Sequence, residues 1–156
     1  MYAEVETLSS HAEISKVYAR NSRDELLVGV RSSKDAKRQC QLDFIGGGKE
    51  SRDRTPEDVA VRELYEEAGI EIAKSALKFV DVTLCPSKSR AGINVISYYE
   101  VSVPDDIAYW YNPAEFAQLF FMPIPEILGE LEHAGQRDML QKYAVQTLHL
   151  DQLVRL

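Results

Sequence analysis

The chain has 156 residues, of which 45% are hydrophobic, and a formal net charge of −7. That length suits one domain with one hydrophobic core, and the acidic balance argues against a broad basic face for nucleic acid or an anionic membrane. We therefore expect a single domain over residues 1–156, with no stable nucleic acid complex and no membrane association. Residues 1–10 lack the apolar core of a secretory signal, and Cys40 and Cys85 lack metal-ligand spacing, so a cytoplasmic location with reduced cysteines is expected.

Three short strands are predicted before the first helix. Residues 13–19 alternate apolar and polar side chains, residues 25–30 form the partner strand of a hairpin, and residues 41–45 lead directly into three glycines. Residues 31–38 are polar and basic, which fits either a solvated connection or a loop that meets an anionic substrate through Arg31 and its neighbours.

A helix is predicted after the glycines, over residues 56–68. Thr55 suits the N-cap, Pro56 suits the first helical position and Gly69 suits the stop. At 100° per residue, one stripe of this helix is predicted to face the core. Its members are Val61, Leu64, Tyr65 and Ala68.

Three carboxylates are predicted to share another face of this helix, those of Glu63, Glu66 and Glu67. Like charges at this spacing cost an isolated helix roughly 0.2–0.5 kcal/mol per pair unless a cation gathers them. Ligands that offer only oxygen suit Mg²⁺ or Mn²⁺. The alternative is a solvated acidic face without a metal, in which Arg62 bridges Asp58 and Glu66.

Residues 48–70 favour the metal site over the solvated face by a resemblance. Gly48, the run Arg62-Glu63-Leu64, Glu66-Glu67 and Gly69-Ile70 resemble the box of the Nudix family, G-x5-E-x7-R-E-U-x-E-E-x-G-U, where U is a bulky apolar residue. Every position matches except the early glutamate, where this chain has Arg54.

The resemblance implies a metal-dependent hydrolase that cleaves a phosphoanhydride bond in a nucleoside diphosphate linked to another moiety. It implies that Glu63, Glu66 and Glu67 bind Mg²⁺ or Mn²⁺ or serve as the base, and that Arg62 orients them. A small nucleotide is the expected partner. The resemblance also allows a homodimer, because family members are frequently dimers.

Substrate contacts are expected around the glycines. Gly47 and Gly48 would let the backbone turn tightly and approach the phosphates closely. Lys49 and Arg54 lie in the following loop, where they are placed to meet phosphate oxygens, as Arg31 is in the earlier loop. A surface role is the alternative for each of these cations.

The departure at Arg54 affects the predicted activity. In the family the early glutamate is usually described as a partner of the main ligands, so its loss bears on the orientation of Arg62. Asp53 and Glu57 are the residues nearby that would compensate. A module that binds a nucleotide without turning it over is therefore the alternative function, and an acidic docking face for a basic protein is a third.

The rest of the chain is predicted to complete a mixed sheet. The later elements are strands at 77–84, 93–103 and 119–124 and helices at 125–131 and 136–147. Glu115 is singled out as a further ligand or base, since the family often has a loop glutamate near this place; a solvent-facing carboxylate is the alternative. The aromatic residues 109–111 either stack on a base or pack on the core. Strands interleaved with helices in this order predict an α/β fold, the Nudix-like α/β/α sandwich with a mixed sheet.

Overall fold

The computed structural model describes residues 11–32, 40–87, 92–148 and 153–154. Their strands form a six-stranded sheet in the order β4-β5-β1-β3-β2-β6. The strands are β1 (Ala12–Arg20), β2 (Glu25–Arg31), β3 (Leu42–Gly48), β4 (Lys78–Pro86), β5 (Ile93–Ser102) and β6 (Phe116–Pro123). Strands β1 and β5 are parallel and the other neighbours are antiparallel, so the sheet is mixed, as predicted.

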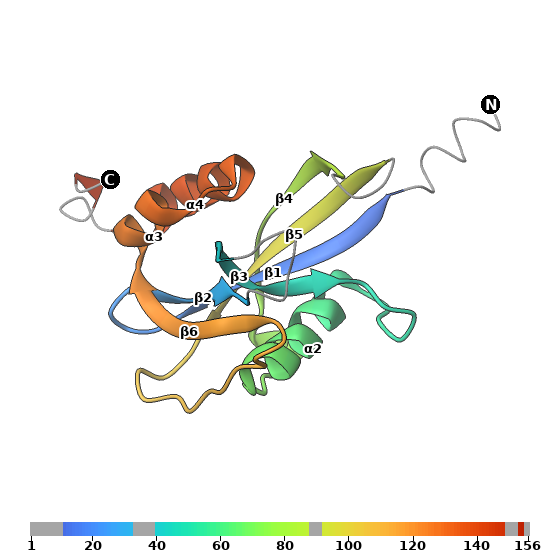
Figure 1. Ribbon diagram of the computed structural model, residues 1–156, viewed down its shortest axis with the longest axis horizontal. Coiled ribbons are helices and arrows are strands. Elements are labelled where there is room, and N and C mark those ends of the chain that lie inside the picture. Colours follow the sequence, from blue (N-terminus) through green and yellow to red (C-terminus); the bar gives the residue numbers. More distant parts are fainter. Residues whose placement is uncertain (1–10, 33–39, 88–91, 149–152, 155–156) are drawn as a thin grey trace.

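Helices cover both faces of this sheet (Figure 1). Helix α2 (Pro56–Ala68) packs on one face, and α3 (Ile124–Glu130) and α4 (Ala134–Thr147) lie over the other. A short 3-10 helix, η1 (Lys74–Ala76), follows α2. The predicted α/β/α sandwich is therefore confirmed. None of the helices in these described ranges is both long and apolar enough to cross a membrane.

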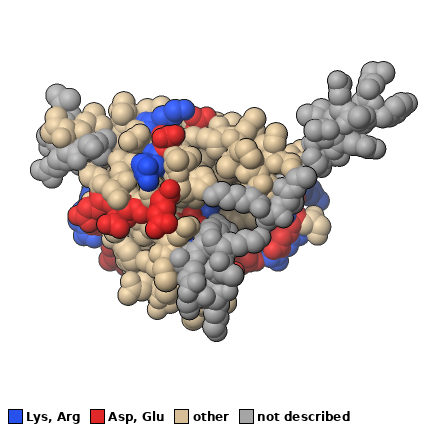
Figure 2. All heavy atoms as spheres, turned by 45° about the horizontal axis from the view of Figure 1, so that its top comes forward, with Lys and Arg blue, Asp and Glu red and all other residues tan. Residues whose placement is uncertain are grey.

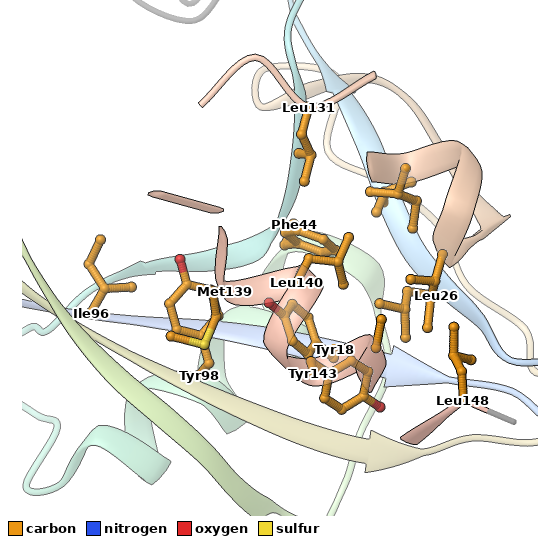
Figure 3. Packing of buried hydrophobic residues seen from close by; sticks show 14 residues of the cluster. Tyr18, Leu26, Phe44, Ile96, Tyr98, Leu131, Met139, Leu140, Tyr143 and Leu148 are labelled. Carbon is orange, nitrogen blue, oxygen red and sulfur yellow. The ribbon is translucent and has the colours of Figure 1, made fainter. Parts of the chain in front are cut away.

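Alternation along the central strand β1 divides the core into two clusters. Tyr18 points to the α3 and α4 side, where its ring lies 4.9 Å from Phe44 and 4.7 Å from Tyr143, measured between centroids (Figure 3). Its neighbours Val17 and Ala19 point to the opposite side and pack in the cluster that includes α2. Successive residues of a strand face opposite sides, which fixes the register of β1 between the two helical layers.

The predicted ends of helix α2 are confirmed. Thr55 is the N-cap and forms a capping box with Asp58, and Gly69 closes the helix in the left-handed conformation with φ 67°. The predicted buried stripe is partly wrong, because Tyr65 is 56% exposed and Val61 is only half-buried. The buried residues of the helix are Val59, Ala60, Leu64, Glu67 and Ala68. The helix is thus rotated so that one glutamate faces the sheet.

The three glycines do not form the expected bend. Gly46, Gly47 and Gly48 continue β3 and pair with Lys16, Ser15 and Ile14 of β1. A Cβ at Gly46 would overlap the carbonyl oxygen of Ser15, and one at Gly47 would collide with the Glu63 carboxylate. Gly46 and Gly47 are needed because β1 and α2 approach this strand closely, whereas a Cβ at Gly48 would make only an ordinary contact.

Two boundaries also differ from the prediction. Arg31 is the last residue of β2 and only 2% exposed, so it does not belong to a solvated loop. The remaining predicted basic residues of that loop, Lys34, Lys37 and Arg38, lie outside the described residues. Strand β6 begins at Phe116, directly after Glu115. Both cysteines are free thiols, with Cys40 exposed and Cys85 half-buried.

Acidic and basic side chains lie beside one another on the face shown in Figure 2, among larger uncharged areas. That view brings forward the side of the molecule on which α3 and α4 lie in Figure 1.

Candidate active site

Glu67 is the buried member of the acidic helix face. Only 4% of the residue is exposed. Its Oε1 accepts a hydrogen bond from the backbone N–H of Gly46 at 2.8 Å, and its Oε2 lies 3.4 Å from Nη1 of Arg31. Burial raises the pKa of Glu67 to about 7, although the charge of Arg31 and the Gly46 N–H favour the ionised form. The Glu67 carboxylate therefore lies on the side of α2 that faces β3, where the Gly46 N–H and Arg31 contact it.

Arg31 joins three carboxylates from different elements. Its guanidinium pairs with Asp43 at 2.9 Å, with Glu67 at 3.4 Å and with Glu115 at 3.3 Å. The same group lies 4.3 Å from the ring centroid of Phe116. An arginine this buried and this fully engaged holds its three carboxylate partners in place, and its predicted contact with an anionic substrate stays a prediction.

Arg62 is the second joining cation. Its Nε and Nη2 hold the Asp53 carboxylate, at 3.1 Å and 2.8 Å, and Nη2 also donates to the Gly48 carbonyl at 2.9 Å. Its Nη1 reaches Glu63 at 2.8 Å and Glu66 at 3.1 Å. The arginine thus links the loop before α2, the end of β3 and two carboxylates of the helix. The bridge from Asp58 to Glu66 considered from the sequence is not formed, because Asp58 pairs with Lys74.

The acidic partner of Arg62 is supplied one position before the missing box glutamate. Of the two residues considered as compensation, Asp53 holds Arg62, and those hydrogen bonds lower the pKa of Asp53. Glu57 instead accepts a hydrogen bond from the Tyr99 hydroxyl at 2.9 Å. Arg54 itself is exposed, so its presence leaves Arg62 oriented.

Glu63 and Glu66 complete the carboxylates around Arg62. The Glu63 side chain is largely buried at 13% exposure and lies against Gly47, whereas that of Glu66 is 42% exposed and also pairs with Arg52 at 2.6 Å. Burial raises the pKa of Glu63 against the opposing hydrogen bond from Arg62. Two of the three glutamates therefore face the Arg62 side, and Glu67 faces Arg31.

Comparison with known proteins identifies the family to which the chain belongs. A family model described as the NUDIX domain matches residues 11–143. The chain belongs to the NUDIX family. These are hydrolases that act on nucleoside diphosphate derivatives, so the family assignment made from residues 48–70 is confirmed.

Individual relatives agree with this assignment. The chain is 31% identical over 109 residues to the uncharacterized Nudix hydrolase NudL of Enterobacter sp. (strain 638), which covers 70% of this chain and 55% of that protein. The chain spans about half the length of the curated relatives it matches.

Solved structures support the NUDIX fold. The MutT protein of Methanosarcina mazei Go1 has a TM-score of 0.75 at 16% identity, over 89% of this chain and 96% of that chain. The NUDIX domain of Shewanella oneidensis NrtR, solved with ADP ribose, has a TM-score of 0.67 at 14% identity, over 90% of this chain and 97% of that chain. At such identities the likeness establishes the shared fold.

The donor set of this NUDIX helix fits a divalent cation. Within the described ranges, no three His, Cys, Asp or Glu side chains are gathered as a ready-made metal site, and Arg31 and Arg62 contact the carboxylates instead. Among the same residues, Oε2 of Glu63 accepts no hydrogen bond, and Oε2 of Glu67 has only the long contact to Arg31. Partly open carboxylate oxygens of this kind are ligands that Mg²⁺ and Mn²⁺ prefer.

The other predicted site residues lie around this helix at different distances. Glu115 is at the site, since its half-exposed carboxylate meets Arg31. Lys49, which follows β3, pairs with Glu13 at 3.0 Å, and both of these side chains are partly exposed. Trp110 covers Gly69 at the end of α2, and Tyr109 packs edge-on against Phe121. The rings of residues 109–111 are nevertheless 37%, 53% and 40% exposed, so packing in the core is wrong for them and stacking on a base stays a prediction.

Asp43, a buried residue that supports the site, was not identified from the sequence. Asp43 is 2% exposed and receives hydrogen bonds from Arg31, Lys16 and Gln136, each at 3.0 Å. It therefore fixes the arginine that contacts Glu67 and Glu115. The available signal was a lone carboxylate inside an apolar strand, which rarely remains buried without a cationic partner.

Proposed function

We propose that this chain is a pyrophosphohydrolase that cleaves a phosphoanhydride bond in a nucleoside diphosphate linked to another moiety. The observation that carries the proposal is the pair of arginine-held carboxylate groups on α2, with Glu67 tied to the Gly46 N–H and Glu63 to Arg62. Such groups on one rigid helix beside a glycine strand suit phosphoryl chemistry, where positioning and charge neutralisation contribute most of the acceleration.

Glu63, Glu66 and Glu67 are the residues that would hold Mg²⁺ or Mn²⁺ in this proposal. The ion, when bound, would neutralise phosphate charge and make water more acidic. Arg62 holds Glu63 and Glu66 in place through its contacts to Asp53 and Gly48. Arg31 does the same for Glu67 and Glu115.

The attacking water must lose a proton as its oxygen bonds to phosphorus and the leaving phosphate departs. Glu63 and Glu115 are the two carboxylates best suited to receive it. Burial raises the pKa of Glu63, which makes its carboxylate a stronger base, and Glu115 is half-exposed beside the site. Comparing pH–rate profiles of Glu63→Gln and Glu115→Gln identifies the base as the residue whose loss removes the acidic limb.

A panel assay tests the proposed function. ADP-ribose, dinucleoside polyphosphates, nucleoside triphosphates, NADH, nucleotide sugars and capped RNA ends are incubated with Mg²⁺, and release of phosphate or mononucleotide is measured. Small nucleotides are favoured, since a structural neighbour, the NrtR NUDIX domain, was solved with ADP ribose. Glu66→Gln is the variant expected to lose turnover by roughly 100-fold or more, and Glu130→Gln, which removes an exposed carboxylate on α3, is the matched control.

The alternative is a NUDIX module that binds a nucleotide without hydrolysing it, which the exchange at Arg54 favours. Intact contacts between Asp53 and Arg62 weigh against it. Binding of Mn²⁺ followed by electron paramagnetic resonance separates the two. If the chain is a hydrolase, it binds Mn²⁺ and Glu66→Gln lowers its affinity for that ion. If the chain binds a nucleotide tightly and turns over no compound of the panel, it is the binding module.

A further inference from the structure

A cavity of about 370 Å³ opens beside the first turns of α2, between the loop that precedes the helix and η1. Its lining residues are Arg52, Asp53, Arg54, Asp58, Val61, Arg62 and Lys74. Four of these side chains are cationic and two are anionic, on a chain whose formal net charge is −7. The cavity is therefore a local reversal of the overall charge.

The two carboxylates in this cavity are already neutralised. Asp53 is held by Arg62, with a closest contact of 2.8 Å. Asp58 pairs with Nζ of Lys74 at 2.7 Å and accepts the backbone N–H groups of Arg54 and Thr55. Neither anion therefore has to be displaced for the cavity to receive a negative group.

Arg54 is the cation left available. Its side chain is exposed, and within the described ranges its guanidinium makes no hydrogen bond or ion pair. Among the described residues, Arg52, beside it, is held by the exposed carboxylates of Glu50 and Glu66 alone. Two guanidinium groups can thus turn toward one ligand, and their planar donor forks match the oxygens of a phosphate.

We propose that this cavity, called here the Arg54 cavity, binds a phosphate or pyrophosphate group. The cavity has ample room for a group of that size, and Val61 supplies an apolar wall. Arg52 and Arg62 line the cavity and also contact Glu66, so a phosphate bound here lies next to the carboxylates of α2. Phosphate binding in this cavity does not depend on the proposed function. Whether that phosphate belongs to the nucleotide substrate does rest on it.

Titration of metal-free protein tests the binding. Pyrophosphate and, separately, inorganic phosphate are added in EDTA at low salt, and backbone amide shifts and calorimetric heats are recorded. Arg54→Glu is expected to weaken pyrophosphate binding by roughly 10-fold or more, because it replaces the available donor with a repelling charge. Arg23→Gln, which removes an exposed arginine paired with Glu25 and Asp105, should leave the affinity unchanged.

Two results would overturn the proposal. One is equal pyrophosphate affinity in the wild type and Arg54→Glu. The other is a set of shifted amides centred on residues 46–48 instead of residues 52–58 and 74–76. A native amide spectrum of Arg54→Glu establishes that the exposed substitution leaves the fold intact, so weak binding by that variant reports on the cavity.

A second measurement identifies the carrier of the phosphate. If the substrate brings it, pyrophosphate competes with the nucleotide, and Arg54→Glu raises KM about 10-fold with little change in kcat. If a free phosphate ion is the ligand, pyrophosphate and nucleotide bind together without competition. A protein that hydrolyses no compound of the panel would refute the proposed function and leave the metal-free titration as an independent test of the Arg54 cavity.

Discussion

Substitution of Gly47 by alanine tests whether the close approach of β3 and α2 sets the position of Glu63. A Cβ at Gly47 would stand 2.6 Å from Cδ of Glu63, and ordinary contact begins at 3.4 Å, so the carboxylate must retreat by about 0.8 Å. Misplacement of a catalytic group by about 1 Å costs on the order of 100-fold in rate. We expect kcat to fall by roughly that factor in Gly47→Ala.

Gly48→Ala is the matched control, because its Cβ would meet only the Glu13 carbonyl oxygen at 3.9 Å. Both substitutions keep the backbone groups of β3, including the Gly48 carbonyl that accepts from Arg62. The assay is Mg²⁺-dependent turnover with Mn²⁺ affinity as a second readout, and melting temperature checks the fold. Equal kcat and equal Mn²⁺ affinity in the two variants would refute the proposed dependence of Glu63 on Gly47.

Three further substitutions test other contacts. Asp53→Asn should lower the free energy of unfolding at pH 7 by about 1.5 kcal/mol and turnover by roughly 10-fold. Because Arg62 lowers the pKa of Asp53, this stability is present above pH ~4 and is lost as pH falls further. The free energies of unfolding of the two proteins should therefore converge in an acid titration. Glu67→Gln should raise the melting temperature of metal-free protein at pH 8 by roughly 2–4 °C, since burial penalises the ionised carboxylate, and only the wild type should be stabilised by added Mg²⁺. Gly69→Ala should lower the melting temperature by several degrees, because φ is 67° and the new Cβ would overlap the Trp110 indole, whereas Gly129→Ala meets nothing within 4 Å and should raise it slightly. Opposite or absent shifts in calorimetry would contradict each expectation.

The ends of α2 were predictable because their signals are local. Thr55, Asp58 and Gly69 act on backbone groups within a few positions of themselves, so sequence alone identifies the cap and the stop. The same locality explains why the box was recognised, since its spacing is that of one helix and the loop before it.

The glycine strand and the burial of Glu67 were not predictable in this way. Sequence patterns assign glycine runs to turns and charged residues to solvent. Here the close contacts of β3 with β1 and α2 require Gly46 and Gly47, and Glu67 is stabilised at the sheet by Gly46 and Arg31. Tyr65 was assigned to the core because the apolar pattern does not show that α2 turns its Glu67 side, and not its Tyr65 side, toward the sheet.

The partners of Arg31 explain why its role was missed. Asp43, Glu67 and Glu115 lie 12, 36 and 84 positions away in sequence, and only the folded sheet brings them to one guanidinium. A charged residue at the end of a strand therefore looked like part of the loop that follows it. Long-range pairs of this kind need the strand order, which local patterns do not contain.

The exchange at Arg54 is explained by the geometry of the loop before α2. The Asp53 N–H bonds to the Glu50 carbonyl, and the Glu50 N–H bonds to the Asp53 carboxylate, so this turn directs Asp53 inward to Arg62. Arg54, the next residue, is left exposed at the mouth of its cavity. Because an aspartate already supplies the negative partner of Arg62, a glutamate at the next position is not required there. The position is then available to carry a cation, and a single change of charge can supply a phosphate contact without disturbing the carboxylates of α2.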